Sequence, residues 1–153
     1  MTTESLSQAP LDSPVSFGAA LANAPTAFAP TILVADDDDD IRDLIAFKMR
    51  AAGYHVVTAD TGTVALHLVE TQLPDAVVLD VGMPGLDGFS ICYRLQSLRA
   101  TVHIPLIIVS SRDSQNDISM GYTIGADDYL TKPFHPDDLV RRVRWLLMAN
   151  DDE

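Results

Sequence analysis

Short apolar runs alternate with segments of helical periodicity along most of this chain. Each run is only a few residues long and is rich in Val, Ile and Leu, as expected for a strand that is buried on both faces. The segments between the runs carry apolar residues at helical spacing, as in Ile41, Leu44, Ile45 and Met49. The runs occupy residues 31–35, 55–59, 75–80, 105–109 and 128–130.

This alternation predicts a doubly wound α/β fold. Strands that are joined by crossing helices form a parallel sheet with helices on both of its faces. The flavodoxin-like version of the fold has the strand order 2-1-3-4-5 and binds its ligand where strands 1 and 3 diverge. We therefore expect a five-stranded, flavodoxin-like sheet whose site lies at the carboxyl ends of the strands.

Side chains that can carry chemistry stand at these strand ends. Asp36 and Asp37 follow the first run, Asp80 ends the third, Ser110 follows the fourth and Lys132 follows the fifth. Taken alone, an aspartate at a strand end is as well explained by a turn-capping role. In the order 2-1-3-4-5, however, all five side chains converge on one crevice, which favours a functional site.

Three carboxylates in one crevice require positive charge nearby. Without it, their mutual repulsion would keep at least one of them protonated. Mg2+ binds carboxylates, water and phosphate oxygens, and Lys132 offers a mobile ammonium for a phosphoryl oxygen. The Ser110 hydroxyl and the backbone N–H groups of the neighbouring loops can bind further oxygens. These features favour phosphoryl transfer to a carboxylate, which forms an aspartyl phosphate.

Length and composition narrow the class of protein. A chain of 153 residues suits one domain, and the single cysteine, Cys92, excludes an internal disulfide and fits a reducing cytoplasm. The formal net charge of -12 argues against direct nucleic-acid binding and favours cations or basic partner surfaces. No apolar run is long enough for a membrane helix, and no basic stretch marks a signal peptide. We therefore expect a cytoplasmic protein with no membrane contact.

The two ends of the chain lie outside the alternating pattern. Residues 1–30 are rich in Ala, Pro, Ser and Thr and show no sustained periodicity, which predicts a disordered leader. Residues 31–150 form the predicted domain. Residues 151–153 form a short acidic tail.

Two helices allow more local expectations. In the first, Asp39 is expected to be the N-cap residue. In the last, which begins at Pro136, we expect Trp145 at the edge of the core, with a place on a partner-binding face as the alternative. Arg141, Arg142 and Arg144 are expected on a solvated face of the same helix.

Four motifs at the strand ends resemble those of one known family. They are I-L-V-A-D-D, V-V-L-D-V-G-M-P-G-L-D-G, I-I-V-S-S and Y-L-T-K-P-F. Any one of them is a weak signal, but together they occur in the order and spacing of a CheY-like receiver domain. Across roughly residues 31–150, the chain is similar to the receiver domains of bacterial two-component response regulators.

The resemblance implies roles for the residues of the crevice. The phosphoacceptor role falls on Asp80. Mg2+ binding falls on Asp37 directly, on Asp36 through water, on Asp80 and on the backbone carbonyl of Gly82. The phosphate-contacting lysine is Lys132.

The resemblance also implies a switch and points to two departures from the family pattern. Ser110 takes the place of the switch hydroxyl, Tyr129 that of the aromatic that moves inward with it, and Pro133 that of a proline with a preceding cis bond. Gly82 is smaller than the usual residue two positions after the acceptor, and Arg112 is a long cation two positions after the switch serine. We hypothesise that Gly82 leaves the path to the phosphoryl group open to water, while Arg112 covers part of it.

The implied function is a phosphorylation-activated signalling switch and not an enzyme acting on other molecules. A histidine kinase or histidine phosphotransfer protein would donate the phosphoryl group. The signal would leave through the face formed by residues 113–124, residues 128–130 and the last helix. Because the chain ends soon after that helix, we expect a protein effector, or transfer of the phosphoryl group onward. A phosphorylation-dependent homodimer is left open.

Two alternatives belong to other classes. The pair Asp36-x-Asp38 fits the nucleophile motif of haloacid-dehalogenase-like, Mg2+-dependent phosphatases. Against that family, Asp40 stands where Thr or Val is usual, and the acidic pair at residues 127–128 precedes Lys132 instead of following it. The second alternative is a scaffolding receiver that takes no phosphate, but the complete set of acidic, hydroxyl and lysine residues argues against it.

Overall fold

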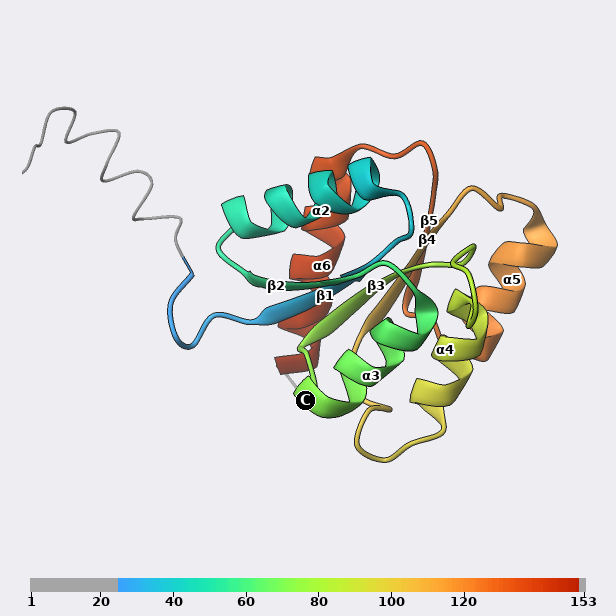
Figure 1. Ribbon diagram of the computed structural model, residues 1–153, viewed down its shortest axis with the longest axis horizontal. Coiled ribbons are helices and arrows are strands. Elements are labelled where there is room, and N and C mark those ends of the chain that lie inside the picture. Colours follow the sequence, from blue (N-terminus) through green and yellow to red (C-terminus); the bar gives the residue numbers. More distant parts are fainter. Residues whose placement is uncertain (1–24, 152–153) are drawn as a thin grey trace, which may run out of the picture.

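The computed structural model describes residues 25–151 and contains a five-stranded parallel sheet in the order β2-β1-β3-β4-β5 (Figure 1). This confirms the flavodoxin-like fold and the strand order predicted from the sequence. The strands are β1 (Thr31–Ala35), β2 (His55–Ala59), β3 (Ala76–Asp80), β4 (Leu106–Ser110) and β5 (Asp128–Thr131). The helices are α2 (Asp39–Ala51), α3 (Gly62–Gln72), α4 (Gly88–Gln96), α5 (Gln115–Ile124) and α6 (Pro136–Asp151).

The predicted leader and tail lie mostly outside the described residues. Of the leader, residues 25–30 are described and include a turn in which Ala29 N–H donates to the Thr26 carbonyl. The same carbonyl lies 2.6 Å from Nε2 of His55 at the start of β2. Residues 25–30 are therefore in contact with the sheet.

The central strand β3 contributes side chains to two hydrophobic cores, one on each face of the sheet. Every residue of β3 is buried, and successive residues point to opposite faces of the sheet. Val77 and Leu79 pack in one core with side chains of α3, α4 and α5, whereas Ala76 and Val78 pack in the other with α2 and α6. Figure 1 shows the two helical layers on opposite sides of the sheet. This sandwich fixes β3, and hence the position of Asp80 at its carboxyl end.

Polar side chains cap the helices that begin near the site. At α2 the N-cap is Asp38, whose Oδ1 accepts from the N–H groups of Asp40 and Ile41 at 3.0 and 3.1 Å. The prediction of Asp39 was therefore wrong by one residue; Asp39 lies in the first turn, where its charge favours the positive end of the helix dipole. Asp87 caps α4 in the same way.

Two expectations for α6 were also wrong. Trp145 is 67% exposed and lies outside the core, because Leu139 and Val143 already occupy the buried stripe of the helix. Arg142 is not simply solvated: its guanidinium bonds both carboxylate oxygens of Asp128 at 2.9 and 3.0 Å. Periodicity places residues on a face of a helix but does not reveal which partner that face meets.

Among residues 25–151, none of the helices combines the length and apolar character that a membrane crossing requires.

Cys92 should resist alkylation in the folded protein. The thiol lies on the buried face of α4, and burial raises its pKa to about 11, with a smaller contribution from the charge of Asp127. Both effects suppress the thiolate, which is the reactive form. We expect mass spectrometry to show almost no iodoacetamide adduct at neutral pH without denaturant and complete labelling in urea. Rapid labelling of the native protein would show that the core opens at Cys92.

Candidate functional site

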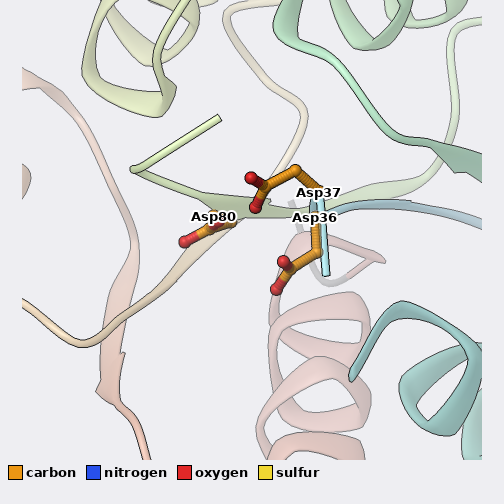
Figure 2. A group of neighbouring side chains, drawn as sticks. All are labelled: Asp36, Asp37 and Asp80. Carbon is orange, nitrogen blue, oxygen red and sulfur yellow. The ribbon is translucent and has the colours of Figure 1, made fainter. Parts of the chain in front are cut away.

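Three aspartates meet at the carboxyl edge of the sheet. Asp36 and Asp37 follow β1, and Asp80 ends the neighbouring strand β3 (Figure 2). One carboxylate oxygen of each residue lies within 4.8 Å of those of the other two. Asp36 and Asp80 are only 2% and 7% exposed, whereas Asp37 is exposed. The convergence that the strand order predicted is thus present for all three carboxylates.

Lys132 neutralises part of this charge. It follows β5, and its Nζ lies 2.9 Å from Oδ2 of Asp36 and 3.5 Å from Oδ1 of Asp80. Its backbone N–H donates to the Ser110 carbonyl at 2.8 Å, which ties the ends of β5 and β4 together. The next peptide bond, Lys132–Pro133, is cis. The ammonium therefore reaches the carboxylates from the end of β5, the edge strand next to β4.

Burial and charge set the protonation of the pair. Burial raises the pKa of Asp80, the nearby charge of Asp36 raises it further, and Lys132 and the Gly82 N–H lower it only in part. Burial lowers the pKa of Lys132, but its contacts with Asp36 and Asp80 outweigh this effect and raise that pKa overall. The site therefore stabilises the protonated, positively charged form of Lys132 and destabilises the ionised form of Asp80.

The switch candidates form a second group beside the first. Ser110 is buried, and its Oγ accepts from Arg112 N–H at 3.0 Å. The hydroxyl of Tyr129 donates to the carbonyl of Arg112 at 2.7 Å. The Arg112 guanidinium lies over the ring of Phe89, 5.9 Å from its centroid. Ser110 and Tyr129 are thus joined through Arg112 and not through the carboxylates.

The donor set fits a hard divalent cation. Carboxylate oxygens are the ligands that Mg2+ prefers. The two oxygens of Asp36 are already engaged, Oδ1 by Asp38 N–H at 2.9 Å and Oδ2 by Lys132. Direct ligation is therefore easier for Asp37 and Asp80, with Asp36 acting through water. Gly82 lies nearby: a Cβ on it would be 4.0 Å from Oδ2 of Asp80.

The fold and this acidic edge define a class of protein, and comparison with known families identifies it. Residues 32–144 match the model of the response regulator receiver domain. The chain belongs to this family, whose members generally act as signalling phosphoacceptors with Mg2+.

Individual relatives support the same assignment. The chain is 38% identical over 120 residues to the alkaline phosphatase synthesis transcriptional regulatory protein PhoP of Bacillus subtilis, covering 78% of this chain and 49% of PhoP. It is 38% identical over 122 residues to the DNA-binding response regulator MtrA of Mycobacterium tuberculosis, covering 80% and 52%. The solved BeF3-activated DrrB receiver domain has a TM-score of 0.71 and 32% identity, covering 79% of this chain and 99% of DrrB.

These relatives correct one prediction. The net charge was taken to argue against nucleic-acid binding, yet MtrA is named as a DNA-binding response regulator. The exclusion was wrong because charge summed over a receiver region reports its carboxylate cluster and solvated surface, and does not decide what a response regulator contacts. The chain spans about half the length of these curated relatives.

Proposed function

We propose that this chain is a phosphorylation-activated switch in which Asp80 accepts a phosphoryl group from a histidine kinase or a histidine phosphotransfer protein. The observation that carries the proposal is the position of Asp80. It is buried at a strand end, beside two further carboxylates and an ammonium. A carboxylate is costly to bury, so one that is kept buried and crowded by other carboxylates is a candidate for a functional role.

The chemistry requires positioning and charge neutralisation. An oxygen of Asp80 attacks phosphorus in line, the P–N bond of the phosphohistidine donor breaks, and the imidazole takes up a proton as it leaves. Lys132 follows the added charge, exchanging its 3.5 Å contact with Asp80 for a phosphoryl oxygen. Asp36, Asp37, Asp80 and the carbonyl of Gly82 would hold Mg2+, which supplies neutralisation of the phosphoryl oxygens.

The output would leave through the loop after β4. A phosphoryl oxygen would accept a hydrogen bond from the Ser110 hydroxyl and draw it toward Asp80, away from Arg112 N–H, which here donates to Ser110 Oγ. A shift at Ser110 reaches Tyr129 through the Arg112 carbonyl, and from there the face formed by α5, β5 and α6. The ion pair of Arg142 with Asp128 joins α6 to β5 within that face. We propose that a downstream partner reads this face.

The phosphatase alternative is disfavoured by the position of Asp38. A haloacid-dehalogenase-like mechanism would need Asp36 as nucleophile and Asp38 as the proton-transferring partner. Here the Asp38 carboxylate accepts from the backbone at the start of α2 and is occupied as a cap. Asp36 is also bound to Lys132 through Oδ2.

The position of the acyl phosphate tests the proposal. After incubation with acetyl phosphate and Mg2+, reduction with borohydride converts a phosphorylated aspartate to homoserine, which peptide mapping locates. We expect the modified residue to be Asp80. Modification of Asp36, together with turnover of a phosphate ester that survives Asp80→Asn, would overturn the proposal in favour of the phosphatase.

Two substitutions should change the phosphoryl lifetime in opposite directions. Gly82→Asn places a side chain next to Oδ2 of Asp80 and should slow hydrolysis. Arg112→Ala removes the long cation that we hypothesise covers part of the path to the phosphoryl group, and should speed hydrolysis. Each effect should be roughly tenfold or less, or about 1.4 kcal/mol of barrier. Dephosphorylation rates of purified phosphoprotein measure this, with Arg99→Ala as a control in the loop after α4. Rates unchanged in both variants would contradict the assigned roles.

A further inference from the structure

A glycine in the middle of α5 lies against the ring of Tyr129. A Cβ atom placed on Gly121 would lie 2.8 Å from Cδ2 and 3.1 Å from Cε2 of Tyr129, and 3.4 Å from Cδ1 of Ile108. Packed carbon atoms normally lie about 3.5–4.0 Å apart. The observed position of the ring is therefore compatible with glycine at residue 121 and not with a larger residue.

Helix geometry does not account for this glycine. Among the described glycines, a positive φ occurs at Gly53, Gly85 and Gly125, but not at Gly121. A glycine inside a helix destabilises it relative to alanine, because it increases the conformational freedom lost on folding. The feature that does account for Gly121 is the close approach of the Tyr129 ring to the helix backbone.

The ring held against Gly121 is connected to the phosphorylation site by a single residue. Tyr129 is 7% exposed, and its hydroxyl donates to the Arg112 carbonyl. The N–H of the same residue donates to Oγ of Ser110. Both backbone polar atoms of Arg112 are thereby engaged. If the Tyr129 ring left this position, the hydrogen bond from its hydroxyl to the Arg112 carbonyl would be lost.

We propose that Gly121 is a positioning residue for the switch: by lacking a side chain it forms the slot that accommodates the inward ring of Tyr129. This inference rests on the proposed function, since it concerns how readily the Ser110–Arg112 segment responds to a phosphoryl group on Asp80. The ring occupies the inward position in this structure, where its hydroxyl reaches the Arg112 carbonyl.

The proposal has an energetic consequence for binding at Asp80. If the phosphoryl-bound state requires an inward ring, the apparent affinity for a phosphoryl analogue falls with the fraction of molecules that hold the ring inward. A methyl group at residue 121 overpacks the slot and should displace the ring. An inward fraction reduced to about one tenth weakens the apparent affinity about tenfold.

The test uses beryllofluoride with Mg2+ as the phosphoryl analogue. Its affinity is measured for the full chain as wild type, Gly121→Ala, Tyr129→Ala and the double variant, with Ser119→Ala as an exposed control on α5. The ring resonances of Tyr129, assigned with Tyr129→Phe, report its position by NMR. A change in the ring resonances of Tyr129 would show a positioning role for Gly121, which a general loss of stability would not produce in the folded protein.

We expect Gly121→Ala to weaken analogue binding about tenfold and to move the free ring to solvent. In the Tyr129→Ala background the same substitution should leave the affinity unchanged, and Ser119→Ala should behave as wild type. A Gly121→Ala protein that keeps the ring inward and the affinity unchanged overturns the inference. A wild-type protein that binds no beryllofluoride would instead be a failure of the proposed function.

Urea unfolding gives a second test of the slot, which does not depend on analogue binding at Asp80. Gly121→Ala should lower the urea midpoint when Tyr129 is present, because of overpacking. It should raise the midpoint in Tyr129→Ala, because alanine is a better helix residue than glycine and only Cδ1 of Ile108, at 3.4 Å, is still close. If Gly121→Ala alone fails to fold, folding of the double variant still supports the slot. An increase in both backgrounds would contradict it.

Discussion

Replacing Asp80 with asparagine should make the metal-free protein more stable, by on the order of 1 kcal/mol. Burial and the charge of Asp36 raise the pKa of Asp80, so the ionised carboxylate is less stable in the folded protein than in water. Asparagine has almost the same shape and no charge. Lys132 keeps its shorter contact, the 2.9 Å bond to Asp36. A carboxylate retained at this cost in stability is consistent with a role in function.

The stability difference should depend on pH in a defined direction. A carboxyl with a raised folded pKa destabilises the folded state only where it ionises. The difference should therefore be absent below the ordinary pKa of about 4, grow as the pH rises through the raised value, and level off above it. Mg2+ should act in the opposite sense and stabilise the wild type, by about 2.7 kcal/mol at one hundred times its Kd.

Urea unfolding in EDTA and in Mg2+ measures both effects. Asp43→Asn, an exposed substitution on α2, is the matched control and should change little. If Asp80→Asn destabilised the metal-free protein by a similar amount at every pH, Asp80 would be a structural residue, and the electrostatic account of the site would be contradicted.

Gly62→Ala should be the most damaging single substitution outside the acidic cluster. Gly62 is buried at the start of α3, and a Cβ there would collide with the carbonyl of Leu86. Because the obstacle is backbone, the loop of residues 81–87 must move as a unit. Overpacking of this kind costs about 1–3 kcal/mol or more.

The same loop carries Gly82, so Gly62→Ala should also slow phosphorylation of Asp80. Urea midpoints and initial rates with acetyl phosphate measure the two effects. Thr63→Ala, at the exposed neighbouring position, should show neither. A Gly62→Ala protein of wild-type stability would mean that α3 and the loop do not approach each other as described.

The fold was predictable because the strands of a parallel sheet are buried on both faces and therefore appear in the sequence as short, continuous apolar runs. The first two strands begin and end where the sequence placed them, and the third, fourth and fifth differ by only a residue or so. Strand order then brought Asp36, Asp37, Asp80 and Lys132 together, since carboxyl ends of neighbouring strands meet at one edge.

What the sequence missed depends on contacts between distant elements. Whether Asp38 or Asp39 caps α2 depends on where the helix begins, and adjacent aspartates do not reveal that. The pairing of Arg142 with Asp128 joins residues on different elements and follows no local period. Gly121 was missed for the same reason: only the packed ring of Tyr129 explains why this helix carries a glycine.

The most direct test of the central claim is the intact mass of the protein after incubation with acetyl phosphate, with and without Mg2+. Wild type should gain a single phosphoryl group only when Mg2+ is present, as the acyl P–O bond breaks and acetate leaves. Asp80→Asn should gain none, although it remains folded and stable. An adduct that persists in Asp80→Asn, or a wild-type protein that gains none, would contradict the account of Asp80 as the phosphoacceptor.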